Sequence, residues 1–128
     1  MIVATTLPDG RPHAIPVWYV WDGAAAVYFT TTRGSQKQKN LAHLQYAVVH
    51  FGDGDDVLFA EGGIEIVTDG AEKKRVDADY RAKYIDPVSG KSASVYDNPK
   101  DDLYRVDVVR FVTWMYGTVR GWSEWRFD

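Results

Sequence analysis

The sequence has 128 residues, of which 45% are hydrophobic and 26% charged, enough for one modest hydrophobic core. Its net charge of −3 argues against non-specific nucleic-acid binding, which needs a broad basic surface. The absence of cysteine excludes disulfides and thiolate metal sites, and no apolar run approaches the ~20 residues of a membrane span. We therefore expect a cytoplasmic globular protein that binds neither nucleic acid nor a membrane.

The N-terminal part predicts consecutive β-strands. Residues 1–6, 13–22 and 26–32 read as strands, and turn sequences at 7–10 and 22–23 separate them. Pro16 removes one backbone donor, so its strand should lie at a sheet edge or a bulge. The short connections indicate a meander of hairpins.

The rest of the chain predicts two helices and further strands. Ser35 is a suitable N-cap for a short helix over 36–44, and a second helix is expected over 71–85. Strands are expected at 45–52, 56–68, 103–119 and 121–128, with a bulge or bend at Gly62 and Gly63 and a long surface loop at 86–102. Six or seven strands with two helices fit a closed or nearly closed antiparallel barrel in one domain, 1–128.

The segment from Thr30 to Asn40 concentrates groups that bind anions. It combines three threonines, Ser35 and the cations Arg33, Lys37 and Lys39 with a helix N-terminus. A phosphate monoester needs several charge-assisted donors of this kind, and the free N–H groups of a helix start add to them. A basic turn followed by a solvated helix face is the alternative interpretation.

The strand with Pro16 offers a second element of a binding site. An edge strand leaves backbone N–H and C=O groups unpaired, and a planar heterocycle could pair with them. An ordinary edge strand is the alternative. His13 and Tyr19 are only weak candidates for proton delivery, so the catalytic residues remain unassigned.

The C-terminal region is rich in large aromatic and basic side chains. They form either a flat wall near a ligand or ordinary core and interface packing; the residues are Trp114, Trp122, Trp125, Arg120 and Arg126. The three histidines, His13, His43 and His50, lack the spacing of metal ligands, so we predict no metal site.

Several motifs together resemble those of a known family. They are Ala4–His13 followed by Pro16-Val17-Trp18-Tyr19, then Thr30-Thr31-Thr32, Ser35-x-Lys37-x-Lys39-Asn40-Leu41 and Glu61–Val67. The sequence is similar to the pyridoxamine 5′-phosphate oxidase-like FMN-binding split-barrel proteins over residues 1–69. Within them it looks closest to a short branch in which many members use the deazaflavin coenzyme F-420.

This resemblance implies a mainly β protein with two or three short helices, folded as a split antiparallel β-barrel. It implies a homodimer with two cofactor sites at the subunit interface and either FMN or coenzyme F-420 as the cofactor. The cofactor-binding residues that it implies are Pro16, Val17, Trp18, Thr30, Thr31, Thr32, Ser35, Lys37, Lys39 and Asn40. Two family features are absent: the N-terminal helix and a proline before the strand at 45–52.

The resemblance favours a flavin- or deazaflavin-dependent oxidoreductase that transfers hydride to a small organic acceptor. Pyridoxamine phosphate oxidase activity itself is not expected, because the C-terminal region does not clearly show that enzyme's substrate-binding pattern. The alternatives are a non-catalytic flavin-binding or sensing protein, a carrier of another phosphate ligand such as pyridoxal phosphate, and a structural dimer with a degenerate site. FMN and F-420 share the ribityl phosphate, so the phosphate segment does not distinguish them.

Overall fold

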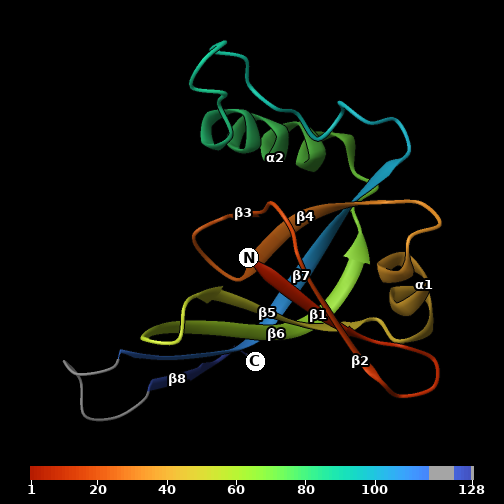
Figure 1. Cartoon of the computed structure of the whole chain (residues 1–128), viewed down its shortest axis with the longest axis vertical. Coiled ribbons are helices and arrows are strands. Elements are labelled where there is room, and N and C mark those ends of the chain that lie inside the picture. Colours follow the sequence, from red (N-terminus) through yellow and green to blue (C-terminus); the bar gives the residue numbers. More distant parts are fainter. Residues whose placement is uncertain (116–122, 128) are drawn as a thin grey trace.

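The computed structural model describes residues 1–115 and 123–127, which form eight β-strands and two α-helices (Figure 1). In chain order they are β1 (Ile2–Thr6), β2 (Pro12–Pro16), β3 (Val20–Trp21), β4 (Ala26–Thr32), α1 (Gln36–His43), β5 (Tyr46–Gly52), β6 (Asp56–Ile66), α2 (Gly70–Lys83), β7 (Asp101–Met115) and β8 (Ser123–Arg126). No helix among these residues is long and apolar enough to cross a membrane.

All strands belong to one antiparallel sheet in the order β2-β1-β5-β6-β7-β4-β3, and β8 pairs with β7. The sheet curls so that the long strand β7 runs through the molecule, with α1 on one side and α2 at one end (Figure 1). The expected mainly β, split-barrel fold is confirmed.

The strand expected at 13–22 is two strands. Pro16 pairs with Ile2 of β1, whereas Val20 pairs with Tyr28 of β4, so the chain crosses between the two edges of the sheet. Residues 17–19 leave the ladder as they cross. Pro16 was expected at a sheet edge or a bulge, and it lies at an edge, because β2 pairs with β1 alone among the described strands.

Strand β4 separates two parts of the hydrophobic core. Val27 and Phe29 belong to the cluster inside the barrel, and Ala26 and Tyr28 belong to the cluster beneath α2. The side chains divide in this way because successive side chains of a β-strand point to opposite faces of the sheet. Val76 of α2 completes the second cluster, so β4 is held from both faces just before the chain enters α1.

The predicted bulge is confirmed between Glu61 and Gly62, where the β6–β7 register shifts. A Cβ at Gly62 would collide with the backbone carbonyl of Asp107, whereas one at Gly63 would be 4.0 Å from its nearest neighbour. Glycine at position 62 therefore permits the close approach of β6 to β7.

The helix predictions are correct apart from one or two residues at the ends. Leu44 is the C-cap of α1 rather than its last helical residue, and α2 begins at Gly70 and ends at Lys83. Strand β7 begins at Asp101, two residues before the expected start. The expected strand residues 116–119, 121, 122 and 128 lie outside the described part of the chain, as do Arg120 and Trp122.

Candidate functional site

The turn from β4 into α1 brings two hydroxyl-bearing residues, Thr31 and Ser35, together at the start of a helix. Gly34 has a positive φ of 83°, which lets the chain reverse before Ser35. The Ser35 Oγ accepts a hydrogen bond from the Gln38 N–H at 3.3 Å and lies 3.1 Å from the Thr31 Oγ1. Ser35 is therefore the N-cap, as the sequence predicts, and its hydroxyl pairs with that of Thr31.

The N-termini of the two helices differ in charge. At α2 the carboxylate of Asp69 accepts hydrogen bonds from Ala71 and Glu72, and Glu72 adds a second acidic group. At α1 the cap is the neutral Ser35, and the first turn contains no acidic residue. The positive end of the α1 dipole is thus not neutralised by its own first turn, which favours an external anion.

The two lysines of α1 have different surroundings. Lys37 is partly buried, and this burial lowers the pKa of its ammonium group, although the charge of Asp101 acts in the opposite direction. Lys39 is exposed. Residues two apart in a helix do not face the same way, so Lys37 is the better candidate for a phosphate ligand.

Arg33 and Thr32 bind the start of β7. The Arg33 Nε donates to Asp102 at 3.1 Å, and the Thr32 Oγ1 donates to Asp101 at 2.6 Å. These contacts join residues 69 apart in the sequence, so local spacing gave no signal for them. The guanidinium of Arg33 therefore stabilises the turn that carries the anion-binding groups, and its charge is offset by Asp102.

Asn40 is fully buried and has a positioning role in this chain. Its Nδ2 donates to the Thr5 Oγ1 at 2.9 Å, and its Oδ1 accepts from the Gln36 Nε2 at 2.8 Å. These bonds attach α1 to β1. Its amide is therefore not presented at the surface beside Lys37, and any effect on a bound phosphate acts through the position of α1.

Residues 16–18, where the chain leaves β2 and begins to cross, present an exposed aromatic ring and an unpaired backbone. We call these three residues the crossing segment. The Val17 N–H donates to the Met1 carbonyl at 2.9 Å, but the backbone of Trp18 has no hydrogen-bond partner within the described residues. The Trp18 side chain is 58% exposed. The backbone of Trp18, which lies beyond the end of β2, therefore leaves one donor and one acceptor free for the edge of a planar ligand.

Tyr84, just after α2, fixes this segment and was missed in the sequence. Its Oη accepts from the Tyr19 N–H at 2.7 Å and donates to the Tyr19 carbonyl at 2.9 Å. Its ring stacks on Trp18 with centroids 4.6 Å apart and an 8° angle between planes. The only signal for this residue in the sequence was the alignment of aromatic side chains on one side of the predicted helix. That pattern is equally typical of core packing.

The remaining predicted residues lie near the β4–α1 turn and the crossing segment. Thr30 pairs with Leu103 in the ladder, and Pro16 is exposed at the sheet edge. The His13 Nδ1 is buried and has no partner in the described structure. The Lys83 ammonium lies over the Tyr19 ring, 3.2 Å from its centroid.

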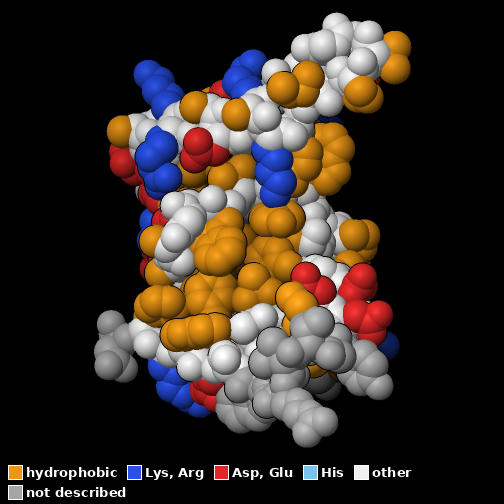
Figure 2. Space-filling view, turned by 90° about the vertical axis from the view of Figure 1, so that its left-hand side faces the viewer, with side chains coloured by type: hydrophobic (Ala, Val, Ile, Leu, Met, Phe, Trp, Pro, Cys, Tyr) orange, Lys and Arg blue, Asp and Glu red, His pale blue; other side chains and the backbone are white. Residues whose placement is uncertain are grey.

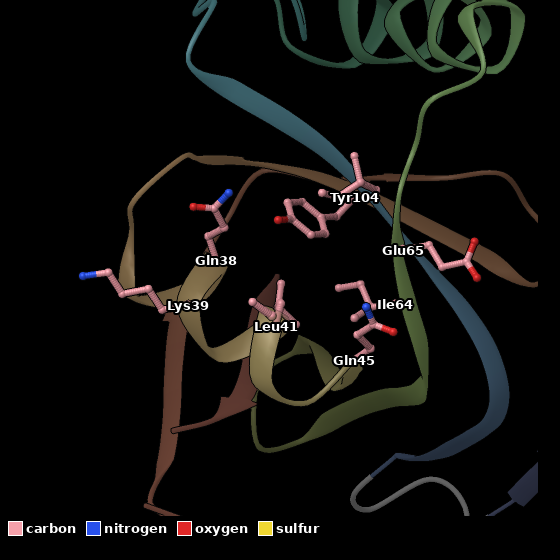
Figure 3. A pocket seen from close by; sticks show the side chains of 9 residues that line it. Gln38, Lys39, Leu41, Gln45, Ile64, Glu65 and Tyr104 are labelled. Carbon is pink, nitrogen blue, oxygen red and sulfur yellow. The ribbon is translucent and has the colours of Figure 1, made fainter. Parts of the chain in front are cut away.

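A cavity of about 530 Å³ lies between α1 and β6 (Figure 3). Leu41, Ile64 and Tyr104 form its apolar part, and Gln38 and Lys39 border it. Figure 3 shows the Lys39 side chain extending away from the cavity. Neither Ser35 nor Lys37 lines this cavity, so it is distinct from the predicted phosphate-binding residues.

The C-terminal aromatic residues contribute to an apolar surface. Trp125 and Phe127 join Trp21, Leu58 and Phe111 around a cavity of about 330 Å³, and we call these five residues the aromatic face. Figure 2 shows a broad hydrophobic area on this side of the molecule.

Two other residues of the predicted C-terminal cluster are placed differently. Trp114 lies against Phe59, with ring centroids 6.3 Å apart, and Arg126 forms an ion pair with Glu124 at 2.6 Å. Within residues 1–115 and 123–127, no group of three His, Asp or Glu side chains could hold a metal ion.

Comparison with solved structures finds the same fold in proteins of different described function. An F-420 reductase is 25% identical, with a TM-score of 0.62 and coverage of 86% of both chains. A pyridoxamine 5′-phosphate oxidase-related, FMN-binding protein from Nostoc punctiforme is 12% identical (TM-score 0.58; 99% of this chain and 85% of that one). A heme-binding protein from Mycobacterium smegmatis is 18% identical (TM-score 0.69; 98% and 51%). The last two share only the fold at these identities.

No curated protein sequence matches the chain. The family model for pyridoxamine 5′-phosphate oxidase, however, matches residues 1–115, which include both the 16–18 segment and the β4–α1 turn. The chain therefore belongs to the pyridoxamine 5′-phosphate oxidase-like family of split-barrel proteins.

Proposed function

We propose that this protein binds FMN or coenzyme F-420 and acts as an oxidoreductase that transfers hydride to a small organic acceptor. The observation that carries the proposal is the β4–α1 turn. There, the paired hydroxyls of Thr31 and Ser35 and the partly buried Lys37 lie at a helix N-terminus without acidic residues. Both cofactors contain a ribityl phosphate that such donors would bind.

The other end of the proposed site is the crossing segment. The antiparallel pairing of β3 with β4 brings the chain that contains Trp18 to the strand that ends in Thr30–Thr32. The unpaired backbone of Trp18 would bind the ring edge, and Pro16 and Val17 would border the ring. Family membership and the likeness to an F-420 reductase support a flavin or deazaflavin in this place.

In this proposal the protein orients the cofactor, and the cofactor when bound supplies the hydride chemistry. The Ser35 hydroxyl would donate to a phosphate oxygen and accept a hydrogen bond from the buried Thr31 hydroxyl, while Lys37 would supply positive charge. Lys39 would add longer-range attraction from the exposed side of α1. Asn40 would hold α1 against β1, and Thr32 would hold Asp101 in place.

The proposal is tested by titrating the purified chain with FMN and with F-420 side by side and following absorbance. Lys37→Ala should weaken whichever cofactor binds by about 10- to 100-fold, because a hydrogen bond to a charged group is worth about 1.5–3 kcal/mol. Lys74→Ala, which removes an exposed lysine from α2, is the matched control and should leave the affinity unchanged. Equal affinity of the wild type and Lys37→Ala would refute the phosphate assignment.

A second measurement separates catalysis from simple binding. The pre-reduced cofactor is mixed with menadione in the presence and absence of protein, and its reoxidation is followed. An oxidoreductase should accelerate this reaction above the rate in free solution. If the cofactor binds tightly but the protein does not accelerate its reoxidation by any acceptor tested, the non-catalytic binding or sensing alternative is favoured.

A further inference from the structure

A third cavity, of about 330 Å³, opens beside the Trp18–Tyr84 stack. Pro87 and Ala93 form apolar parts of its lining, and Lys83 and Lys91 contribute positive charges. This volume is at the lower end of the range for small-ligand pockets. Because Trp18 also belongs to the proposed ring-binding segment, the cavity adjoins the reactive end of the proposed cofactor site.

Backbone hydrogen bonds connect the segments that form the wall of this cavity. The Asp86 N–H donates to the Lys91 carbonyl at 2.9 Å, and the Ala93 N–H donates to the Tyr84 carbonyl at 2.9 Å. Ile85 and Ser92 form an isolated antiparallel bridge. The turn that carries Lys91 is therefore a short closed hairpin attached to the end of α2.

The cavity combines a planar aromatic wall with net positive charge. Asp86 is the one acidic group among its lining residues, and its Oδ1 already accepts hydrogen bonds from the N–H groups of Val88 and Ser89 at 2.8 and 2.9 Å. The Lys83 ammonium donates to the Tyr19 carbonyl at 3.0 Å and retains further donors. The C-terminal carbonyls of α2 reduce the positive potential near Lys83, so Lys91 is the cation to test.

We propose that this cavity binds the organic acceptor and selects a planar aromatic anion, such as an aromatic carboxylate. The ring would lie against the Trp18–Tyr84 stack, and its carboxylate would face Lys83 and Lys91. The identification of this ligand as the acceptor rests on the proposed function, whereas the binding of an aromatic anion in the cavity does not.

The probe is 2-naphthoate, compared with the neutral analogue 2-naphthol by calorimetric titration at neutral pH. The full chain is titrated with and without FMN. We expect 2-naphthoate to bind up to about fivefold more tightly than 2-naphthol, the upper end of what one exposed charge pair contributes. Lys91→Ala should remove most of this preference, Lys91→Arg should keep it, and Lys74→Ala should not change it.

Two results would overturn the inference: equal binding of 2-naphthoate and 2-naphthol, or an unchanged preference in Lys91→Ala. The FMN dissociation constant is measured for the same variants and should not change in Lys91→Ala. Failure of the wild type to bind FMN or F-420 would refute the proposed function separately, because the naphthoate titration of the cofactor-free chain still tests the cavity.

Discussion

Lys37 and Lys39 show how two residues of one short motif take different roles. Both are cations near the start of α1, but only Lys37 is partly buried near Asp101. Asn40, in the same motif, turns inward and binds Thr5. Spacing alone predicts that the two lysines point in different directions. Which of them is partly buried depends on the packing of α1 against distant segments, including the start of β7.

The lowered pKa of Lys37 predicts how cofactor binding depends on pH. Burial lowers this pKa from its ordinary value of 10.5, so the ammonium loses its proton, and its attraction for phosphate, below that pH. We expect the affinity for FMN to fall as the pH rises towards 10.5 in the wild type. In Lys37→Arg the fall should be smaller, because guanidinium remains charged throughout this range.

This comparison is made by absorbance titration, with circular dichroism at each pH to show that the protein remains folded. A wild-type affinity that does not change across this range would contradict the assignment of Lys37 as the phosphate-binding cation.

Strand β6 and its bulge show how one element sets the shape of the barrel. The alternation of apolar residues predicts the strand, and the glycine pair predicts an irregularity. The pair does not reveal which glycine is essential, because that depends on the partner strand. Only the close approach of the Asp107 carbonyl distinguishes Gly62 from Gly63.

The two glycines therefore make a matched pair of substitutions. Gly62→Ala should lower the free energy of unfolding by about 3 kcal/mol or more, because its Cβ would force β6 away from β7. Gly63→Ala should change it by less than about 1 kcal/mol, since its Cβ meets only ordinary contacts. Urea unfolding of both variants measures the difference, and equal destabilisation would disprove this explanation of the bulge.

The aromatic face is the feature of the whole molecule most suited to covering by a second copy. Trp21, Trp125 and Phe127 are 40%, 51% and 43% exposed and lie around one cavity. Exposed apolar patches of this kind are typical of association sites. We propose that this face is buried in the homodimer that the family resemblance implies.

Trp125→Asp should convert this dimer to a monomer, because a carboxylate would be desolvated at the interface. Size-exclusion chromatography with light scattering measures the mass of the wild type and the variant. Val88→Asp changes a residue that is 95% exposed in a turn and should leave the mass unchanged. A monomeric wild type, or a Trp125→Asp variant that stays dimeric, would exclude this face as the interface.

The sequence by itself determined most of the strands, the two helices and the Ser35 cap, because these depend on local periodicity and backbone chemistry. It also predicts the segment with Thr31, Ser35 and Lys37 as the phosphate site. The tertiary structure alone decided that 13–22 divides at the crossing and that Asn40 is buried. It also decided that Tyr84 holds the backbone beside Trp18. The reason is physical: each of these outcomes depends on contacts between segments that no local pattern of residues encodes.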